Sequence, residues 1–115
     1  MRIRTYDDVV LLAPSGWIMG GDETDALGEV IARLLDAGNR RLVLDLHEVS
    51  MMNSTALGVL TAARAAYEAK GGHIVLCNVD ARIDHILLIT KLALLFDAYP
   101  TVREAVGAFA AERTA

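Results

Sequence analysis

Apolar residues are distributed along this chain in two patterns. Short apolar runs bounded by Gly, Pro or Asp are typical of buried strands, whereas apolar residues three or four positions apart indicate helices. The predicted strands cover residues 2–6, 9–13, 17–19, 41–46, 73–77 and 94–99. The predicted helices cover residues 22–38, 54–70 and 80–90, and a last helix opens at Thr101 with a capping-box pattern.

This order of elements predicts the fold class. Two strands come first and are followed by a regular alternation of helices and strands, which is typical of an α/β layer with short connections. We expect a mixed sheet of about four to five strands and about four α-helices, mostly on one face. No linker, internal repeat or low-complexity segment divides the 115 residues, so we expect one domain over residues 1–115.

Composition and charge narrow the possible partners. Apolar residues make up 54% of the chain and aromatic residues 5%, which predicts an aliphatic core. The formal charge is −4 with acidic and basic residues mixed, and this argues against nucleic acid as a partner. No apolar stretch approaches the ~20 residues of a membrane span, so we expect no membrane insertion. With Cys77 as the single cysteine and no signal-peptide pattern in residues 1–4, we expect a cytoplasmic protein.

The sequence lacks the residue patterns of a catalytic or metal site. His47, His73 and His85 do not have the spacing of metal ligands, and no Gly-rich phosphate loop follows a strand. We therefore expect no catalytic residues, no metal, no cofactor and no enzymatic activity. A small nucleotide-binding or hydrolytic enzyme has little in its favour.

The polar run Asn53-Ser54-Thr55 follows the predicted strand over residues 41–46 and stands where a helix begins. Backbone N–H groups and the positive end of the helix dipole are free there, so a hydroxyl could cap the helix or carry a phosphate. From spacing alone the cap is the commoner role. Met51 and Met52, in the loop just before, could fill the core or contact a partner. Both questions remain open at the level of the residues.

Two segments, residues 42–60 and 71–77, resemble the STAS domain, and more narrowly the single-domain bacterial anti-sigma factor antagonists. The resemblance covers residues 3–109. That family usually reads Asp-Ser-Ser/Thr-Gly-Leu-Gly at this loop, and its first Ser is phosphorylated by a partner anti-sigma factor that is also a kinase. The resemblance implies Ser54 as the phosphorylated residue, with Thr55 as a second candidate. Asn53 and Ala56 depart from the usual Asp and Gly.

The resemblance also implies a partner switch. The unmodified chain would bind the kinase-type anti-sigma factor and free a sigma factor, phosphorylation would end binding, and a phosphatase would reset the system. Two alternatives stay open: a STAS scaffold in a transporter or signalling complex without a covalent switch, which Asn53 favours, and a homodimer. The expected partner surface comprises Gly20, Gly21, Asp22, Met51, Met52, Asn53, Ser54, Thr55, Ala56, Leu57, Thr61 and Arg64.

Overall fold

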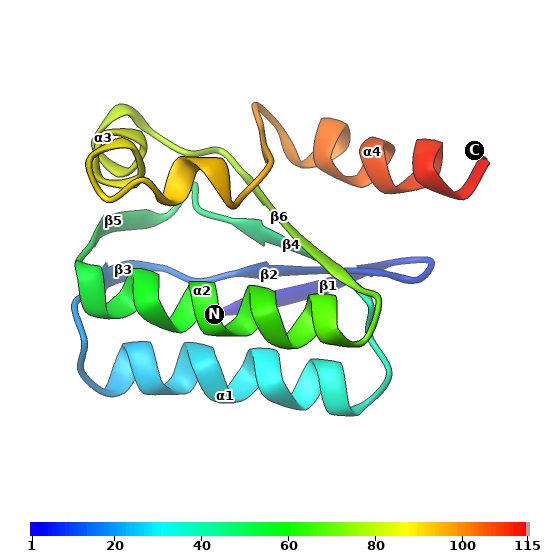
Figure 1. Ribbon diagram of the computed structural model, residues 1–115, viewed down its shortest axis with the longest axis horizontal. Coiled ribbons are helices and arrows are strands. Elements are labelled where there is room, and N and C mark those ends of the chain that lie inside the picture. The colour runs from blue at the N-terminus through cyan, green and yellow to red at the C-terminus, as the bar shows by residue number, and fades with distance from the viewer. Residues whose placement is uncertain (115) are drawn as a thin grey trace.

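The computed structural model describes the backbone of residues 1–114 and the side chains of residues 1–111; Ala115, the last residue of the predicted domain, lies outside the described residues. A five-stranded sheet lies at the centre of the fold (Figure 1). Its strands, in spatial order, are β1 (Arg2–Tyr6), β2 (Val9–Ala13), β4 (Arg41–Asp45), β6 (His73–Cys77) and β7 (Ala98–Tyr99). β1 runs antiparallel to β2 and the other neighbouring pairs are parallel, so the predicted mixed sheet is confirmed.

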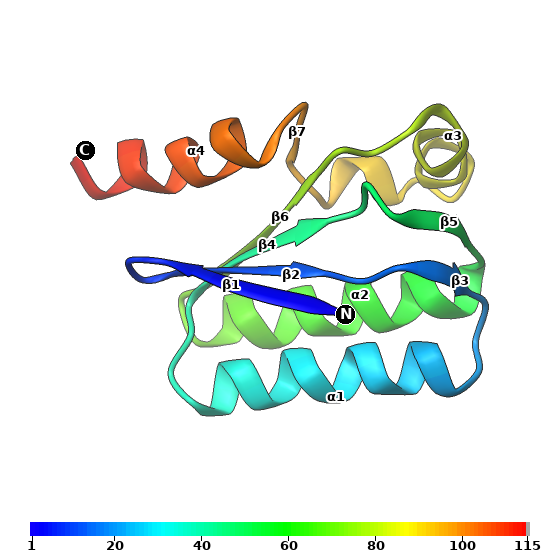
Figure 2. The same cartoon turned by 180° about the vertical axis from the view of Figure 1, so that it is seen from behind.

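Two further strands, β3 (Gly16–Ile18) and β5 (Val49–Met52), pair in parallel as a separate small sheet. β3 follows β2 along the chain and β5 follows β4, so this small sheet prolongs the central part of the large one (Figure 2). Strand β5 was not predicted. The expectation that Met51 and Met52 lie in a loop is therefore wrong, because both residues belong to this ladder.

The four predicted helices are present as α1 (Asp22–Asp36), α2 (Ser54–Ala69), α3 (Ala81–Ile89) and α4 (Val102–Thr114). Helices α1 and α2 lie side by side and run in the same direction, so both begin at the end of the molecule that carries β3 and β5 (Figure 1). One buried cluster joins the sheet to these helices, with Leu42 of β4, Leu27 of α1 and Leu60 of α2 at its centre. Ile83 and Leu87 of α3 belong to the same cluster.

Helix α4 covers the other face of the sheet. Ala105 and Phe109 pack there with Val43 of β4 and with Val75 and Cys77 of β6. Neighbouring residues of β4 thus serve opposite faces, because successive side chains of a strand alternate. The continuous apolar run of β4 follows from this burial on both faces, and three of the four helices share one core as expected.

The predicted strand over residues 94–99 is only partly correct. Lys91 adopts a left-handed conformation with φ 63°, and a short 3-10 helix, η1 (Leu92–Leu94), follows it. Phe96 is buried in the core shared with α3, so the apolar run before β7 fills space instead of pairing with a neighbouring strand. None of the helices over the described residues is long and apolar enough to cross a membrane.

Candidate functional site

The start of α2 is capped by Asn53, which precedes the first helical residue. Its side-chain Oδ1 accepts a hydrogen bond of 3.0 Å from the backbone N–H of Ala56, and its own backbone is extended. This is the geometry of an N-cap. Ser54 is consequently the first residue of the helix, where its exposed side chain takes no part in the cap. Of the two roles left open for Ser54, the cap belongs to Asn53 instead.

Asn53 also joins the start of α2 to the loop between β3 and α1. Its amide Nδ2 donates a hydrogen bond of 2.8 Å to the carbonyl oxygen of Met19, and its backbone N–H donates one of 3.4 Å to the carbonyl of Ile18. An ionised aspartate could accept from Ala56 but could not donate to Met19. The departure from the usual Asp therefore gives this chain a link between two loops that Asp would not provide.

Gly20 allows the two loops to approach closely. Its φ of +91° lies in the region that favours glycine, and a Cβ at this position would be 3.3 Å from the Cβ of Thr55. Its backbone N–H donates a 2.8 Å hydrogen bond to the hydroxyl of Thr24, a buried residue of α1. The structure thus brings the predicted residues of the Gly20 loop and of the Asn53–Thr55 segment onto one surface.

Two of the predicted contact residues, Ala56 and Leu57, have buried side chains, 0% and 1% exposed. They belong to the core cluster that the sheet shares with α1, α2 and α3. Met52 is buried as well, whereas Met51 is half-buried on the opposite side of β5. The prediction of partner contacts by the side chains of Met52 and Ala56 is corrected accordingly: they support the surface from below. Leu57 is almost fully buried but is among the residues that line an apolar groove beside Ser54.

Sequence reasoning missed Trp17, which pairs with Met51 in the β3–β5 ladder and is 65% exposed. Its neighbour Met19 is also exposed. The signal available in the sequence was the presence of a single tryptophan in an aromatic-poor chain, placed on a short strand between Gly16 and Ile18.

A mostly apolar groove of about 460 Å³ runs between α2 and the segment that joins α3 to η1. Ser54 lies at its end, and the predicted contact residue Thr61 is among its lining residues, with its hydroxyl donating to the carbonyl of Leu57. The lining residues are Ser54, Leu57, Gly58, Thr61, Ala62, Ala65, Thr90 and Leu92. Small side chains on the α2 wall leave this groove open beside the exposed hydroxyl.

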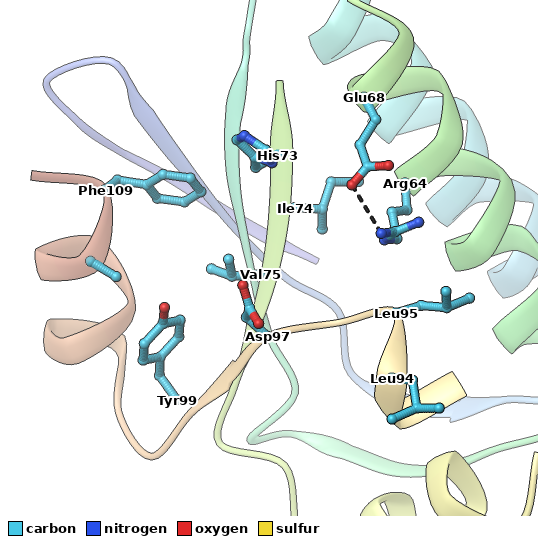
Figure 3. A pocket seen from close by; sticks show the side chains of 11 residues that line it. Arg64, Glu68, His73, Ile74, Val75, Leu94, Leu95, Asp97, Tyr99 and Phe109 are labelled. Carbon is cyan, nitrogen blue, oxygen red and sulfur yellow. Dashed lines mark ion pairs between the residues drawn. The ribbon is translucent and has the colours of Figure 1, made fainter. Parts of the chain in front are cut away.

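The predicted contact residue Arg64 belongs to a different pocket, of about 260 Å³ (Figure 3). Its guanidinium forms an ion pair of 3.0 Å with Glu68, and Asp97 lines the same pocket. The pocket lies beside the part of β6 that β7 does not reach, because the β6–β7 ladder covers Leu76 and Cys77. Arg64 and Ser54 therefore line separate hollows, and the partner contact of Arg64 stays a prediction.

The two parallel helices differ in charge at their starts. The first turn of α1 carries Asp22, Glu23 and Asp25, which complement the positive end of its dipole. The first turn of α2 carries no acidic residue. The positive end of α2, at Ser54, is thus left without a compensating negative charge from its own first turn.

Comparison with known proteins gives a consistent result. Residues 1–105 match the model of the STAS domain family. A protein of Thermotoga neapolitana, provisionally named as an anti-sigma factor antagonist, is 27% identical over 103 residues, which is 90% of this chain and 91% of that protein. The crystal structure of a Thermotoga maritima protein with the same provisional name has a TM-score of 0.86 at 24% identity, covering 93% of this chain and 92% of that one.

Two more distant structures share the fold alone. The phosphorylated form of the Bacillus cell fate determinant SpoIIAA has a TM-score of 0.74 at 15% identity, covering 94% of this chain and 97% of that one. The STAS domain of a SulP transporter from Vibrio cholerae has a TM-score of 0.77 at 18% identity, covering 96% of this chain and 88% of that one.

Proposed function

Because this chain belongs to the STAS domain family, we propose that it acts as an anti-sigma factor antagonist that is switched off by phosphorylation at Ser54. The observation that carries this proposal is the position of Ser54. Its side chain is exposed at the first residue of α2, beside an apolar groove. The resemblance of this loop to the family's pattern implies that Ser54 corresponds to the phosphorylated Ser. Relatives named as anti-sigma factor antagonists support the same class of function.

The charges at the start of α2 support phosphorylation of Ser54 without a change of fold. A phosphoryl group adds about −1.5 to −2 charges, and the free N–H groups and dipole of a helix start favour such a charge. α2 has no acidic side chain in its first turn that would repel it. The added charge instead affects a bound partner, because docking over the apolar groove would remove water from the phosphate. Phosphorylation would thus act on the interface.

The chemistry places a requirement on the partner kinase. In the transfer, a bond forms between Ser54 Oγ and the γ-phosphorus of ATP, the bond to ADP breaks, and the hydroxyl proton must be accepted by a base. Asn53, the neighbouring residue in the loop, carries an amide and cannot serve as that base. We therefore expect the kinase to supply it. A phosphatase would hydrolyse the Ser54 phosphate and restore binding.

The proposal is tested by intact mass spectrometry after incubation with ATP, Mg²⁺ and the kinase-type anti-sigma factor encoded in the same genome. The wild-type chain should gain one phosphate, Ser54→Ala should gain none, and Thr55→Ala, the matched control, should still gain it. Calorimetry should show Ser54→Asp binding the anti-sigma factor at least about tenfold more weakly. An undiminished phosphate gain by Ser54→Ala would refute the assignment.

A STAS scaffold without a covalent switch is the second candidate. Asn53 favours it, since this residue uses both polar atoms of its amide to hold the two loops together and contributes no charge beside Ser54. The fold is also that of a transporter's STAS domain. A chain that gains no phosphate, and whose complex with its partner is unaffected by Ser54→Asp, would favour this scaffold over the switch.

A further inference from the structure

The small β3–β5 sheet presents an uncovered apolar face. Ile18 and Met52 are neighbours in this ladder and both point into the core, at 1% exposure each. Because side chains alternate along a strand, their predecessors Trp17 and Met51 point to the opposite, outward face. Trp17 is 65% exposed there, and Met19, at the end of the same segment, is 43% exposed.

Trp17 has the properties of an interface anchor. It offers a large apolar surface with few rotatable bonds, and its backbone is already fixed by pairing with β5, so little freedom is lost on binding. Tryptophan is among the residues most enriched at the energetic centres of protein interfaces. Half-buried Met51 lies beside it and can adapt its shape to an incoming side chain.

We propose that this outward face, with Trp17 at its centre, is the apolar anchor on which the anti-sigma factor docks. The inference rests on the proposed function and adds the surface that supplies the affinity. The β3–β5 ladder adjoins the segment that carries Ser54, because the neighbouring Asn53 donates hydrogen bonds to the carbonyls of Ile18 and Met19. A partner that reaches the Ser54 hydroxyl therefore finds the Trp17 face joined to it by the same fixed backbone.

Charge favours a foreign partner over a second copy of this chain. Asp22, Glu23 and Asp25 lie exposed on the first turn of α1, at the same end of the molecule as Trp17. A symmetric dimer built through this end of the molecule would bring two such acidic groups together, which is unfavourable. The anchor thus fits an anti-sigma factor whose contact surface has a basic rim.

Binding measurements with the purified anti-sigma factor from the same genome test the anchor. Trp17→Ala should weaken binding about thirtyfold, in the range of interface hot spots. Tyr6→Ala, which removes an exposed aromatic side chain from the hairpin at the opposite end of the molecule, should bind as the wild type does (Figure 1). Circular dichroism should show both variants folded.

A second measurement needs no variant. Trp17 is the single tryptophan, so a chain labelled with 5-fluorotryptophan gives one ¹⁹F signal. Its resonance should shift when unlabelled anti-sigma factor is added. The broadening of this resonance by a soluble paramagnetic probe should decrease in the complex. A resonance that stays unshifted and accessible in the saturated complex would overturn the anchor.

The outcomes separate the anchor from the proposed function. If Ser54→Asp weakens binding but Trp17→Ala does not, the switch stands and the anchor is overturned. If size-exclusion chromatography with light scattering shows a wild-type dimer that Trp17→Ala converts to a monomer, with affinity for the anti-sigma factor unchanged, the face serves a second copy and the anchor is again overturned. If the wild-type chain binds no anti-sigma factor, both proposals fail together.

Discussion

Asn53 holds the start of α2 through its side-chain oxygen and the β3–α1 loop through its side-chain nitrogen. The two hydrogen bonds have different requirements, since one needs an acceptor and the other a donor. A neutral amide satisfies both. At the scale of residues, this explains how a chain can depart from the acidic loop pattern of its family and still keep the two loops on one surface.

Substitution of Asn53 should separate the contributions of its two side-chain hydrogen bonds to stability. Asn53→Asp keeps the cap but replaces the donor to the Met19 carbonyl with a carboxylate oxygen, so we expect the free energy of unfolding to fall by about 1 kcal/mol at neutral pH. Asn53→Ala loses both bonds and should cost about 2 kcal/mol. Urea unfolding measures both values. An Asn53→Asp variant as stable as the wild type would show that the bond to Met19 contributes nothing, and equal losses for the two variants would show the same for the cap.

Ser54 and Trp17 show what residue patterns could and could not predict at this scale. The Ser54 hydroxyl was predicted as a candidate site because the polar trio follows the strand over residues 41–46 and stands at a helix start. That Asn53 rather than Ser54 is the cap depends on a one-residue difference in the helix start, which periodicity does not resolve. The exposure of Trp17 depends on the side of a three-residue strand to which it points.

At the scale of elements, two glycines have different surroundings: Gly28 lies in the contact between α1 and α2, and Gly58 lies on the open side of α2. Gly28 of α1 lies where a Cβ would approach Val59 of α2 to 3.1 Å, so α1 and α2 pack closely there. Gly58 of α2 faces open space beside Ser54 and lines the apolar groove. The first glycine serves the contact between two helices, whereas no contact within the described chain requires the second.

Alanine substitutions at these positions should have opposite effects on stability. Gly58→Ala should raise the free energy of unfolding by about 0.5–1 kcal/mol, because alanine favours the helix and meets no neighbour. Gly28→Ala, the matched control in α1, should gain less or lose stability, because Val59 must move. Thermal and urea unfolding measure both. If the groove receives the anti-sigma factor, Gly58→Ala should also weaken that complex; a destabilised Gly58→Ala would contradict the open space seen here.

The helices and strands were predicted from the sequence, except where a strand pairs with its neighbour over only a few residues. Strands β2, β4 and β6 each contain a continuous apolar run, and the helices carry capping residues or glycine stops. Strand β5 was missed because Val49–Met52 follows a turn, lacks strict alternation and pairs with residues about thirty positions earlier. The last strand was predicted too long because apolar residues before Ala98 fill the core under α3.

At the scale of the whole molecule, two buried titratable side chains, Tyr67 and Cys77, make the stability of the fold depend on pH. The Tyr67 hydroxyl donates a 2.7 Å hydrogen bond to the side chain of Asn39, in the loop before β4. Burial raises the pKa of Tyr67 to about 12, against a smaller opposing effect of Arg40. Burial, together with the charge of Asp45 and a hydrogen bond to it, raises the pKa of Cys77 to about 12. Both groups are neutral in the folded chain over the ordinary pH range.

The fold should consequently weaken in alkali. Both folded-state pKa values lie above the ordinary values of 9.0 for Cys and 10.0 for Tyr, so the unfolded chain loses these protons first. Their stabilising effect is complete below about pH 9 and declines as pH rises toward 12, by up to about 1.4 kcal/mol per pH unit for each group. Urea unfolding at about pH 8 and about pH 10 measures the decline.

Two variants isolate these groups in the alkaline experiment. Cys77→Ala removes the thiol that titrates first, so its free energy of unfolding should fall less between the two pH values than that of the wild type. Tyr67→Phe should lose stability at neutral pH with its bond to Asn39, but should also show a shallower decline. Slopes identical to that of the wild type in both variants would assign the alkaline loss to other groups.

The short pairing of β7 has a consequence for how the protein behaves in concentrated solution. Leu76 and Asn78 donate to the carbonyls of Asp97 and Tyr99, so by alternation the backbone of Ile74 faces the same side, beyond the reach of β7. An open strand edge is a template on which another chain can add a strand and begin to aggregate. The ion pair of Arg64 and Glu68 stands next to this edge, and its charges discourage such growth. We expect these two residues to limit such strand addition, at a surface apart from the one proposed for the partner.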